Sequence, residues 1–252
     1  MIELKNLSKT LGRQTIVKEA STQFHPGFVT SIIGPNGAGK SSLLAMVNRS
    51  MNPDSGDVVI DQKALVEWDV KLLAKSLSML RQANDVTMRF TVRELVSFGR
   101  FPHSRGKLTK DDQVVIDRAI DYLALKPIEN KYLDELSGGQ RQLAFIAMVI
   151  AQDTQYIFLD EPLNNLDIKH SIQIMKTIQN LAHDLGKAVV VVIHDINFAS
   201  SYSDYIVAMK LGEIVAAGKT QEVIREEILA SIYETPFRII DVDGHRMCAY
   251  HH

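Results

Sequence analysis

Apolar and polar residues alternate in the first stretch of the chain, with apolar residues at Ile2, Leu4 and Leu7, and a turn follows around Gly12. Three apolar runs come later: residues 29–33, which Thr30 and Ser31 interrupt, and residues 156–159 and 188–193, which are apolar throughout. Alternation is typical of strands with one buried face, whereas continuous apolar runs are typical of parallel strands that are covered on both faces. None of these runs approaches the roughly 20 apolar residues that cross a bilayer. The pattern therefore predicts antiparallel strands at a sheet edge and a parallel sheet in the core.

Helical spacing replaces the strand pattern between residues 86 and 150. Apolar residues recur there at i, i+3, i+4 and i+7, which marks one buried helix face; they are Leu143, Ile146, Ala147 and Ile150. Strand patterns then return, and a last pair turns at Leu211-Gly212. We interpret the helical stretch as an insertion into one α/β domain.

A glycine-rich segment follows the first apolar run, and it reads Gly34-Pro35-Asn36-Gly37-Ala38-Gly39-Lys40-Ser41, with Ser42 next. A strand, a glycine-rich turn and a helix in this order form the context of a P-loop. The glycines let backbone N–H groups face the phosphates of ATP, and the helix adds its positive dipole end. We expect Lys40 to reach the β- and γ-phosphates and the Ser41 hydroxyl to bind Mg²⁺. A glycine-rich turn alone is usually structural, but the complete pattern favours nucleotide binding.

The second apolar run ends in two carboxylates, Asp160 and Glu161. We expect Asp160 to act as a ligand of Mg²⁺ and Glu161 to polarise the attacking water, because a carboxylate beside a phosphate is otherwise repelled. The fold class that follows is α/β, with a P-loop (RecA-like) nucleotide-binding core, an antiparallel β edge and an inserted α-helical subdomain. We expect a single domain over residues 1–252: a core of residues 1–85 and 151–220, the helical signature subdomain of residues 86–150, and a C-terminal extension of residues 221–252.

A second motif carries the family resemblance, and it reads Leu136-Ser137-Gly138-Gly139-Gln140. With this signature and the P-loop, the chain resembles ATP-binding subunits of ABC importers over nearly its whole length. The resemblance implies an ATPase in which Ser137, Gly138, Gly139 and Gln140 bind the γ-phosphate held by a second copy of the chain. Two ATP molecules would then join two copies, and hydrolysis would loosen them.

The same resemblance assigns further residues. Gln82 occupies the place of the glutamine that senses Mg²⁺ and the γ-phosphate, and His194 matches the histidine that contacts the γ-phosphate. Asp167 belongs, with Asn164, Asn165 and Leu166, to the loop that crosses the dimer interface. Taken singly, each has a plainer explanation: Gln82 as a surface residue, His194 as a structural histidine, and Ser137 as a helix N-cap. All these elements occur in the expected order, with the helical insertion between Gln82 and the signature.

The chain departs from the family pattern at a few positions. Leu11 stands where many members place an aromatic residue against adenine, so an apolar contact remains and stacking worth about 1 kcal/mol is lost. Arg13 could stack instead, although a solvated turn residue is the simpler interpretation. Leu163 and Leu143 replace a common threonine and a common arginine, and we expect both to adjust packing without loss of activity.

Residues 90–103 resemble the equivalent segment of ATPases from iron–siderophore, haem and cobalamin importers, and over the chain the catecholate-siderophore type is most similar. Phe98, Phe101 and Pro102 either pack a helix end or border a groove for a short helix of the permease. The implied partners are a second copy, transmembrane permease subunits and, indirectly, an extracytoplasmic substrate-binding protein. The alternatives are a haem, cobalamin or other metal-chelate transporter, a separately encoded exporter and, less favoured, a non-transport ABC ATPase.

Composition narrows the class of protein further. A net charge of −2 argues against a nucleic-acid partner, and the nearest basic cluster, residues 100–110, is interpreted as a solvated loop. One cysteine, Cys248, cannot form an internal disulfide, which suits a reducing compartment. With no secretion signal at the start, we expect a chain at the cytoplasmic face of the membrane, attached through its permease.

Overall fold

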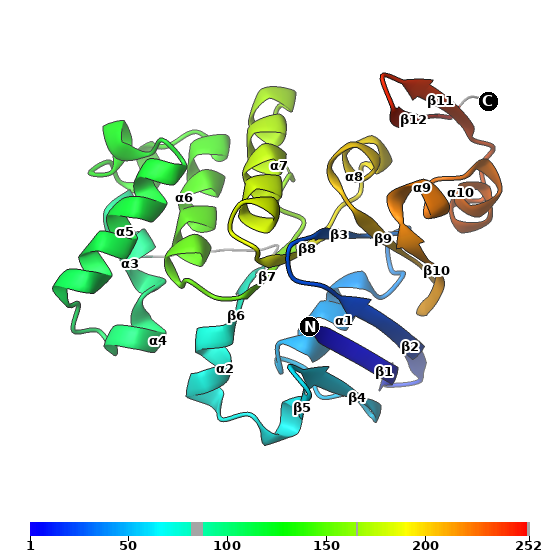
Figure 1. Cartoon of the computed structure of the whole chain (residues 1–252), viewed down its shortest axis with the longest axis horizontal. Coiled ribbons are helices and arrows are strands. Elements are labelled where there is room, and N and C mark those ends of the chain that lie inside the picture. Colours follow the sequence, from blue (N-terminus) through cyan, green and yellow to red (C-terminus); the bar gives the residue numbers. More distant parts are fainter. Residues whose placement is uncertain (82–87, 165, 251–252) are drawn as a thin grey trace. The chain divides into compact units, whose positions relative to one another are not determined.

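The computed structural model describes residues 1–81, 88–164 and 166–250, and these residues form two compact units. One unit contains residues 1–68 together with 178–252, and the other contains residues 69–177. Figure 1 labels the elements along the chain, and each unit is described by itself below.

The described residues of the first unit contain three groups of paired strands, and the shorter elements connect or cover them. Its elements are β1 (Ile2–Leu11), β2 (Gln14–Phe24), β3 (Val29–Ile33), α1 (Lys40–Val47), β4 (Ser55–Ile60), β5 (Lys63–Ala64), η1 (Leu65–Glu67), β8 (Ala188–Val192), α8 (Ile196–Tyr202), β9 (Tyr205–Lys210), β10 (Glu213–Lys219), α9 (Thr220–Val223), α10 (Glu226–Tyr233), β11 (Arg238–Val242) and β12 (His245–Ala249). Strands β2, β1, β4 and β5 form an antiparallel sheet, as the alternation in the first stretch of the chain predicts.

Strands β3, β8 and β9 are parallel, with β3 in the middle, and β10 pairs antiparallel with β9. Every residue of β3 and β8 is buried, which confirms the interpretation of the apolar runs. Because β3 and β8 are parallel neighbours, the segments that follow Ile33 and Val192 leave the sheet at the same edge. This edge positions the phosphate-binding loop next to the segment of His194.

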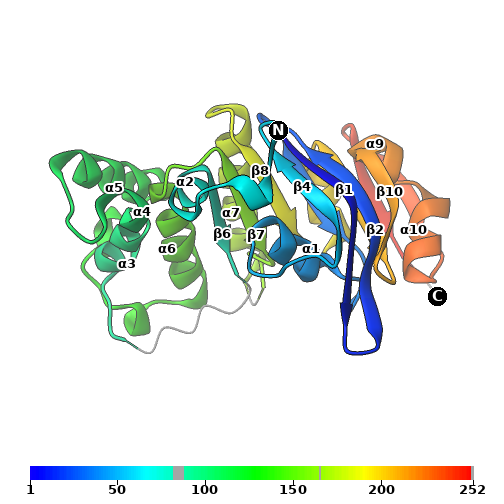
Figure 2. The same ribbon diagram turned by 90° about the horizontal axis from the view of Figure 1, so that it is seen from below.

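The second unit is mainly helical. Its elements are α2 (Val70–Ser76), β6 (Leu77–Leu80), α3 (Val92–Phe98), α4 (Phe101–Ser104), α5 (Lys110–Tyr122), η2 (Lys126–Ile128), η3 (Leu133–Glu135), α6 (Gly138–Ala151) and β7 (Tyr156–Asp160), and α7 (Ile168–His183) begins in this unit and ends in the first. Helices α3, α5 and α6 pack against one another (Figure 2). Strands β6 and β7 are parallel, with Leu80 opposite Leu159.

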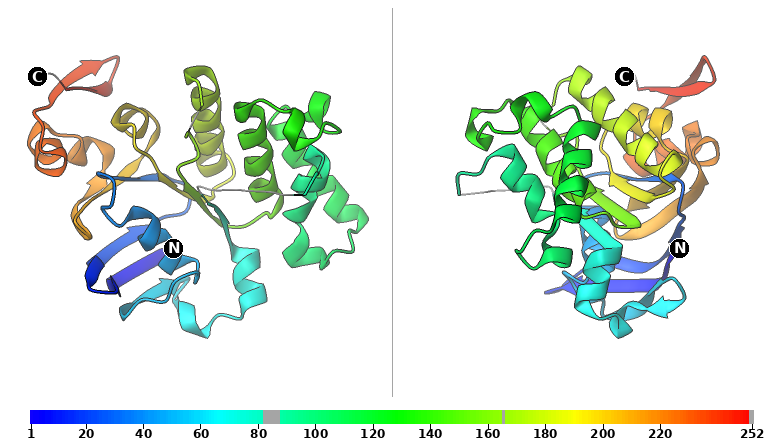
Figure 3. Two further views of the ribbon diagram at one scale, coloured as in Figure 1. Left: turned by 180° about the vertical axis from the view of Figure 1, so that it is seen from behind. Right: turned by 60° about the vertical axis from the view of Figure 1, so that its left-hand side comes forward.

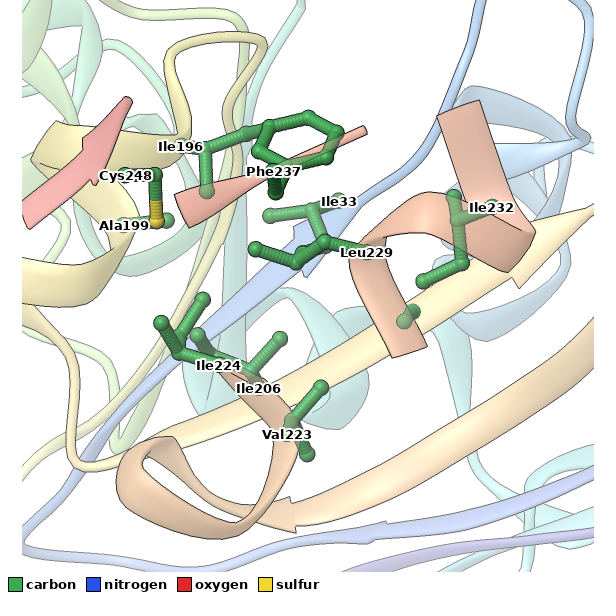
Figure 4. Close-up of a cluster of buried hydrophobic side chains, with 11 residues drawn as sticks. Ile33, Ile196, Ala199, Ile206, Val223, Ile224, Leu229, Ile232, Phe237 and Cys248 are labelled. Atoms are coloured by element: carbon green, nitrogen blue, oxygen red, sulfur yellow. The ribbon is translucent and has the colours of Figure 1, made fainter. Parts of the chain in front are cut away.

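The end of the chain belongs to the core of the first unit. Helices α9 and α10 and the β11–β12 hairpin, drawn in orange and red in Figure 3, follow β10. Their apolar side chains pack with those of β3, α8 and β9 in one buried cluster (Figure 4) that includes Ile33, Ile206, Leu229, Phe237 and Cys248. Burial raises the pKa of the Cys248 thiol to about 11, so the thiol is protonated and packs as an apolar group.

Candidate nucleotide-binding and catalytic site

The phosphate-binding loop connects β3 to α1 and folds around the ammonium group of Lys40. Lys40 Nζ donates hydrogen bonds to the carbonyl oxygens of Gly34 and Pro35, at 2.8 and 2.9 Å, and the side chain is buried. Helix α1 begins after Gly39, which has no side chain to cap the first N–H groups of the helix. A helix N-terminus with a cation at its base attracts a polyphosphate.

Two glycines of this loop are required by close packing against the protein backbone. A Cβ on Gly34 would lie 2.1 Å from the carbonyl oxygen of Met209 in β9, and a Cβ on Gly39 would lie 2.4 Å from that of Ile16 in β2. Gly37 has φ +76° and open space around it, so only its backbone conformation favours glycine. The loop is therefore clamped between β9 and β2.

The other predicted contacts of the loop vary in exposure. Asn36, Gly37 and Ser41 are exposed, Ser42 is half-buried in the first turn of α1, and Ala38 is buried. The Ala38 carbonyl accepts a hydrogen bond from the Gly212 N–H at 3.1 Å, which fixes the loop to the turn between β9 and β10. That turn forms at Leu211-Gly212, as predicted.

Leu11 belongs to the hairpin that adjoins the loop through Ile16, and His194 follows β8, the neighbour of β3. Leu11 ends β1 opposite Gln14 and is 51% exposed, and Ile16 of the same hairpin contacts Gly39. His194 is exposed just after β8, at the sheet edge from which the loop leaves β3. It lines a pocket of about 320 Å³ with Asp195 and Tyr233. Burial raises the pKa of the Tyr233 phenol to about 12.

Asp160 and Glu161 lie at the carboxyl end of β7 in the second unit. Asp160 is buried, whereas Glu161 is half-buried with φ +52°, a backbone conformation that non-glycine residues rarely adopt. The Asn164 side-chain amide donates a hydrogen bond to the Glu161 carboxylate. Sequence reasoning included Asn164 only as part of the loop that contains Asp167, and no spacing rule pointed to this bond.

The signature segment begins α6. Ser137 is the N-cap: its Oγ accepts from the Gln140 N–H at 3.3 Å, while the Gln140 side chain accepts from the Ser137 N–H at 3.2 Å. Ser137 and Gly138 are exposed, and Gly139 is buried against the ring of His170. Ser137 is therefore a helix cap, as its plainer explanation states. A hydroxyl that accepts at the cap still has its own proton to donate to a phosphate.

Asp167 precedes α7 and holds its first turn. Its Oδ1 accepts hydrogen bonds from the backbone N–H and from Nδ1 of His170, both at 2.8 Å. The pKa of Asp167 is lowered by these bonds, the backbone bond contributing most. Among the predicted site residues, Gln82 lies outside the described residues, as does Asn165 beside Asn164.

The helical part of the second unit has an apolar groove of about 440 Å³. Phe90, Phe98, Phe101 and Leu108 line it, and Phe98 and Phe101 are 49% and 61% exposed. The Phe98 ring packs edge-to-face on Phe90 with ring centroids 4.9 Å apart, so it both packs at the helix end and lines the groove, and Pro102 is not part of the lining.

The expectation that residues 100–110 form a solvated loop is wrong for Arg100. Its guanidinium is buried and donates to Asp112 at 2.9 Å and to the Ala151 carbonyl at 2.9 Å. This ion pair ties α5 and α6 to the end of α3.

No helix among the described residues is long and apolar enough to span a membrane.

Comparison with known proteins identifies the family. The model of the family described as "ABC transporter" matches residues 17–164, which is more than half of the chain. The chain belongs to the ABC transporter family. It is therefore an ATP-binding ABC transporter ATPase, and the prediction of ATP as its nucleotide is confirmed.

Two curated relatives match almost end to end. The chain is 53% identical over 250 residues to the petrobactin import ATP-binding protein YclP of Bacillus subtilis (strain 168), and the match covers 99% of each chain. It is 47% identical over 240 residues to the petrobactin import ATP-binding protein FatE of Bacillus anthracis, covering 95% of this chain and 96% of the relative. The predicted resemblance to ATPases of ferric-siderophore importers is confirmed.

Two solved ABC transporter cassettes have the same fold. One, in an ADP conformation, has a TM-score of 0.83 at 22% identity and covers 93% of this chain and 98% of that one. The other, a bacterial cassette solved as a dimer, has a TM-score of 0.76 at 31% identity and covers 87% and 99%. The predicted fold class is confirmed.

Proposed function

We propose that this chain is the ATP-hydrolysing subunit of an importer for ferric siderophores of the petrobactin type. The observation that carries the substrate class is the 53% identity, over 99% of both chains, with a protein named for petrobactin import. The chain itself does not contact the siderophore, because a separate permease and binding protein hold it. Its own residues supply the energy of ATP hydrolysis.

ATP binding depends on the first unit. The N–H groups of the loop from Gly34 to Gly39 and the start of α1 bind the phosphates, and Lys40 neutralises their charge. Ser41 and Ser42 add hydroxyl groups in the first turn of α1. Leu11 provides an exposed apolar contact for the adenine ring.

The donor groups predicted for Mg²⁺ suit this ion. The Ser41 hydroxyl and the Asp160 carboxylate, with Gln82 as the third predicted ligand, are oxygen donors, and Mg²⁺ prefers a few such groups together with substrate phosphates. When bound, the ion neutralises charge that develops on the phosphates during hydrolysis.

Hydrolysis depends on Glu161 and His194. Glu161 orients and polarises the attacking water, and the hydrogen bond from Asn164 holds its carboxylate in one rotamer. His194 contacts the γ-phosphate from the edge of the β3–β8 sheet. The protein forms no covalent bond to the substrate; positioning and charge account for the rate.

Two copies complete each site in this proposal. The segment from Ser137 to Gln140 of one copy contacts the γ-phosphate held by the other, and Asp167 crosses the interface. The dimeric state of a cassette 31% identical to this chain supports this arrangement. Because nucleotide forms much of the interface, we expect a weak or ATP-dependent dimer.

The apolar groove lined by Phe98 and Phe101 receives a short helix of the permease. Exposed aromatic side chains along a groove favour helix docking. This contact would hold the chain at the cytoplasmic face of the membrane. We expect Phe101→Asp to abolish co-purification with the permease and to leave the ATPase activity of the isolated chain intact. The matched control is Val114→Asp, a 48% exposed apolar residue on α5.

Iron uptake tests the proposed substrate class. Cells lacking this chain are re-supplied with wild type, Glu161→Gln or the control Glu227→Gln, whose carboxylate is exposed on α10. Labelled iron is offered as ferric petrobactin, as a hydroxamate siderophore and as haem. We expect wild type and the control to restore petrobactin iron alone. Rescue of haem or hydroxamate iron instead would assign a different importer, and equal rescue by Glu161→Gln would contradict the role of the ATPase.

A further inference from the structure

His170, the third residue of α7, contacts two separate parts of the second unit. Its backbone N–H and its Nδ1 both bond to Asp167 Oδ1 at 2.8 Å. A carboxylate only accepts, so Nδ1 carries the proton in this bond. The side chain is only 27% exposed, which agrees with a ring held in place rather than extended into solvent.

The ring of His170 lies on Gly139 of the signature segment. A Cβ on Gly139 would lie 2.6 Å from Cγ and 2.7 Å from Cδ2 of the imidazole, so the ring occupies the space that any larger residue would need. Gly139 is buried, and the Ser137–Gln140 capping box fixes the turn around it. One side chain therefore touches both the start of α6 and the start of α7.

Capping of α7 explains only part of this arrangement. An aspartate N-cap needs the backbone N–H of the third helical residue, and any side chain at position 170 would leave that bond intact. Neither the Nδ1 bond nor the ring contact with Gly139 contributes to that cap. Both contacts instead fix the distance between the signature segment and Asp167.

We propose that His170 is a positioning residue that holds the signature segment and Asp167 in one fixed arrangement for the nucleotide bound by the second copy. This inference rests on the proposed two-copy function. In the proposed arrangement both parts that His170 contacts face the nucleotide of the second copy, so its effect is on dimer closure. Binding of ATP by the monomer depends on Lys40 and is independent of His170.

ATP-dependent dimerisation in a Glu161→Gln background tests this role. Sedimentation in Mg²⁺ and ATP gives the dimer Kd, and a fluorescent ATP analogue at low protein concentration gives nucleotide binding by the separate chain. We expect His170→Ala to raise the dimer Kd about tenfold, as expected for the loss of one hydrogen bond and one packing contact. Nucleotide binding by the separate chain should stay within about twofold.

Two conservative variants separate the contacts. His170→Asn retains an N–H donor near the position of Nδ1, and His170→Phe retains a ring on Gly139, so each should restore part of the dimer affinity. The matched control is His183→Ala, on the last turn of the same helix, which removes a similar bond from His183 Nε2 to Asp204 at 2.9 Å. We expect that variant to dimerise like its parent.

The outcomes distinguish the two proposals. An unchanged dimer Kd in His170→Ala, beside a parent that dimerises with ATP, would overturn the role of His170 alone. Equal losses of dimer affinity and of nucleotide binding by the separate chain would also overturn it, because they indicate a general folding defect. A Glu161→Gln parent that never dimerises with ATP would contradict the two-copy function itself, and the role of His170 would fall with it.

Discussion

The phosphate loop and the signature segment each place glycines at the start of a helix, and different groups hold them there. Gly34 and Gly39 face main-chain carbonyls of β9 and β2. Gly139 faces the side chain of His170, while Ser137 and Gln140 hold each other. A main-chain clamp cannot yield unless a strand moves, whereas side-chain supports can be removed one by one. Substitutions should therefore disrupt the first site abruptly and the second by degrees.

Glu161→Gln should have the largest effect on activity, and it separates the two sites. The phosphate loop is unchanged, so ATP still binds, but the amide cannot act as a base. We expect kcat to fall by about 100-fold or more, and an ATP-bound dimer to accumulate. Phosphate release and sedimentation measure the two effects. Turnover near that of wild type would remove Glu161 from the chemistry, and Glu227→Gln is the control.

Gly34→Ala should be the most damaging change to the phosphate-loop clamp. The new Cβ would lie 2.1 Å from the Met209 carbonyl, which β9 cannot move without losing its pairing with β3. We expect the free energy of unfolding to fall by about 4 kcal/mol or more. Gly37→Ala meets no atom within 4 Å, so strain at its positive φ should cost about 1 kcal/mol.

Urea unfolding of both variants tests the clamp. Gly27→Ala is the control, because Gly27 has φ +83°, open space and no place in the site. Similar losses for Gly34→Ala and Gly37→Ala would mean that backbone conformation, and not the contact with β9, determines the requirement for glycine.

The sequence predicted the elements that depend on local patterns. Apolar runs identified β3, β7 and β8, and the glycine and serine positions identified both nucleotide motifs. The family resemblance identified His194, which follows β8. The parallel pairing of β8 with β3 puts this segment at the sheet edge of the phosphate loop. The strands and the two nucleotide motifs follow from residues close together in the chain, whereas the place of His194 beside the loop follows from the pairing of β3 with β8.

Contacts that no local sequence pattern specifies were not predicted. Asn164 donates to Glu161, and the backbone of Glu161 has φ +52°, which no residue type in this segment predicts. The buried pair with Asp112 contains Arg100, whose charge and neighbours suggested a solvated loop over residues 100–110. The ring of His170 on Gly139 depends on how α6 and α7 pack, which periodicity does not specify.

Asp112→Ala tests a side-chain support in the helical part of the second unit. It would leave the buried guanidinium of Arg100 without its carboxylate, so we expect the free energy of unfolding to fall by about 3 kcal/mol at pH 7. Chemical denaturation of wild type and variant measures the loss. Asp111→Ala, which removes an exposed carboxylate one residue earlier, is the control.

The same pair predicts a pH dependence. The backbone N–H of Thr109 and the side chain of Arg100 lower the pKa of Asp112 from 3.8 to about 2. Because the pKa is lowered in the folded state, ionised Asp112 contributes fully to the free energy of unfolding above pH 3.8. This contribution is lost as the pH falls through about 2. The difference in free energy of unfolding between wild type and Asp112→Ala should therefore decrease between pH 3.8 and about pH 2. A constant difference would show that the carboxylate charge is not what stabilises α5.

Leu11→Tyr should have the smallest effect, because Leu11 lies on the exposed end of the hairpin whose β2 strand clamps the loop. A ring stacked on adenine adds about 1 kcal/mol, so ATP should bind about fivefold more tightly, with no change in stability. Titration with ATP and GTP measures affinity and base preference, and Val66→Tyr, at a 79% exposed apolar residue, is the control. If Leu11→Tyr changes nothing while Arg13→Ala weakens ATP binding, the base lies on Arg13. In that case the turn of the hairpin, and not the end of β1, contacts the adenine base. The contact between Ile16 and Gly39 would then position this turn relative to the phosphate loop.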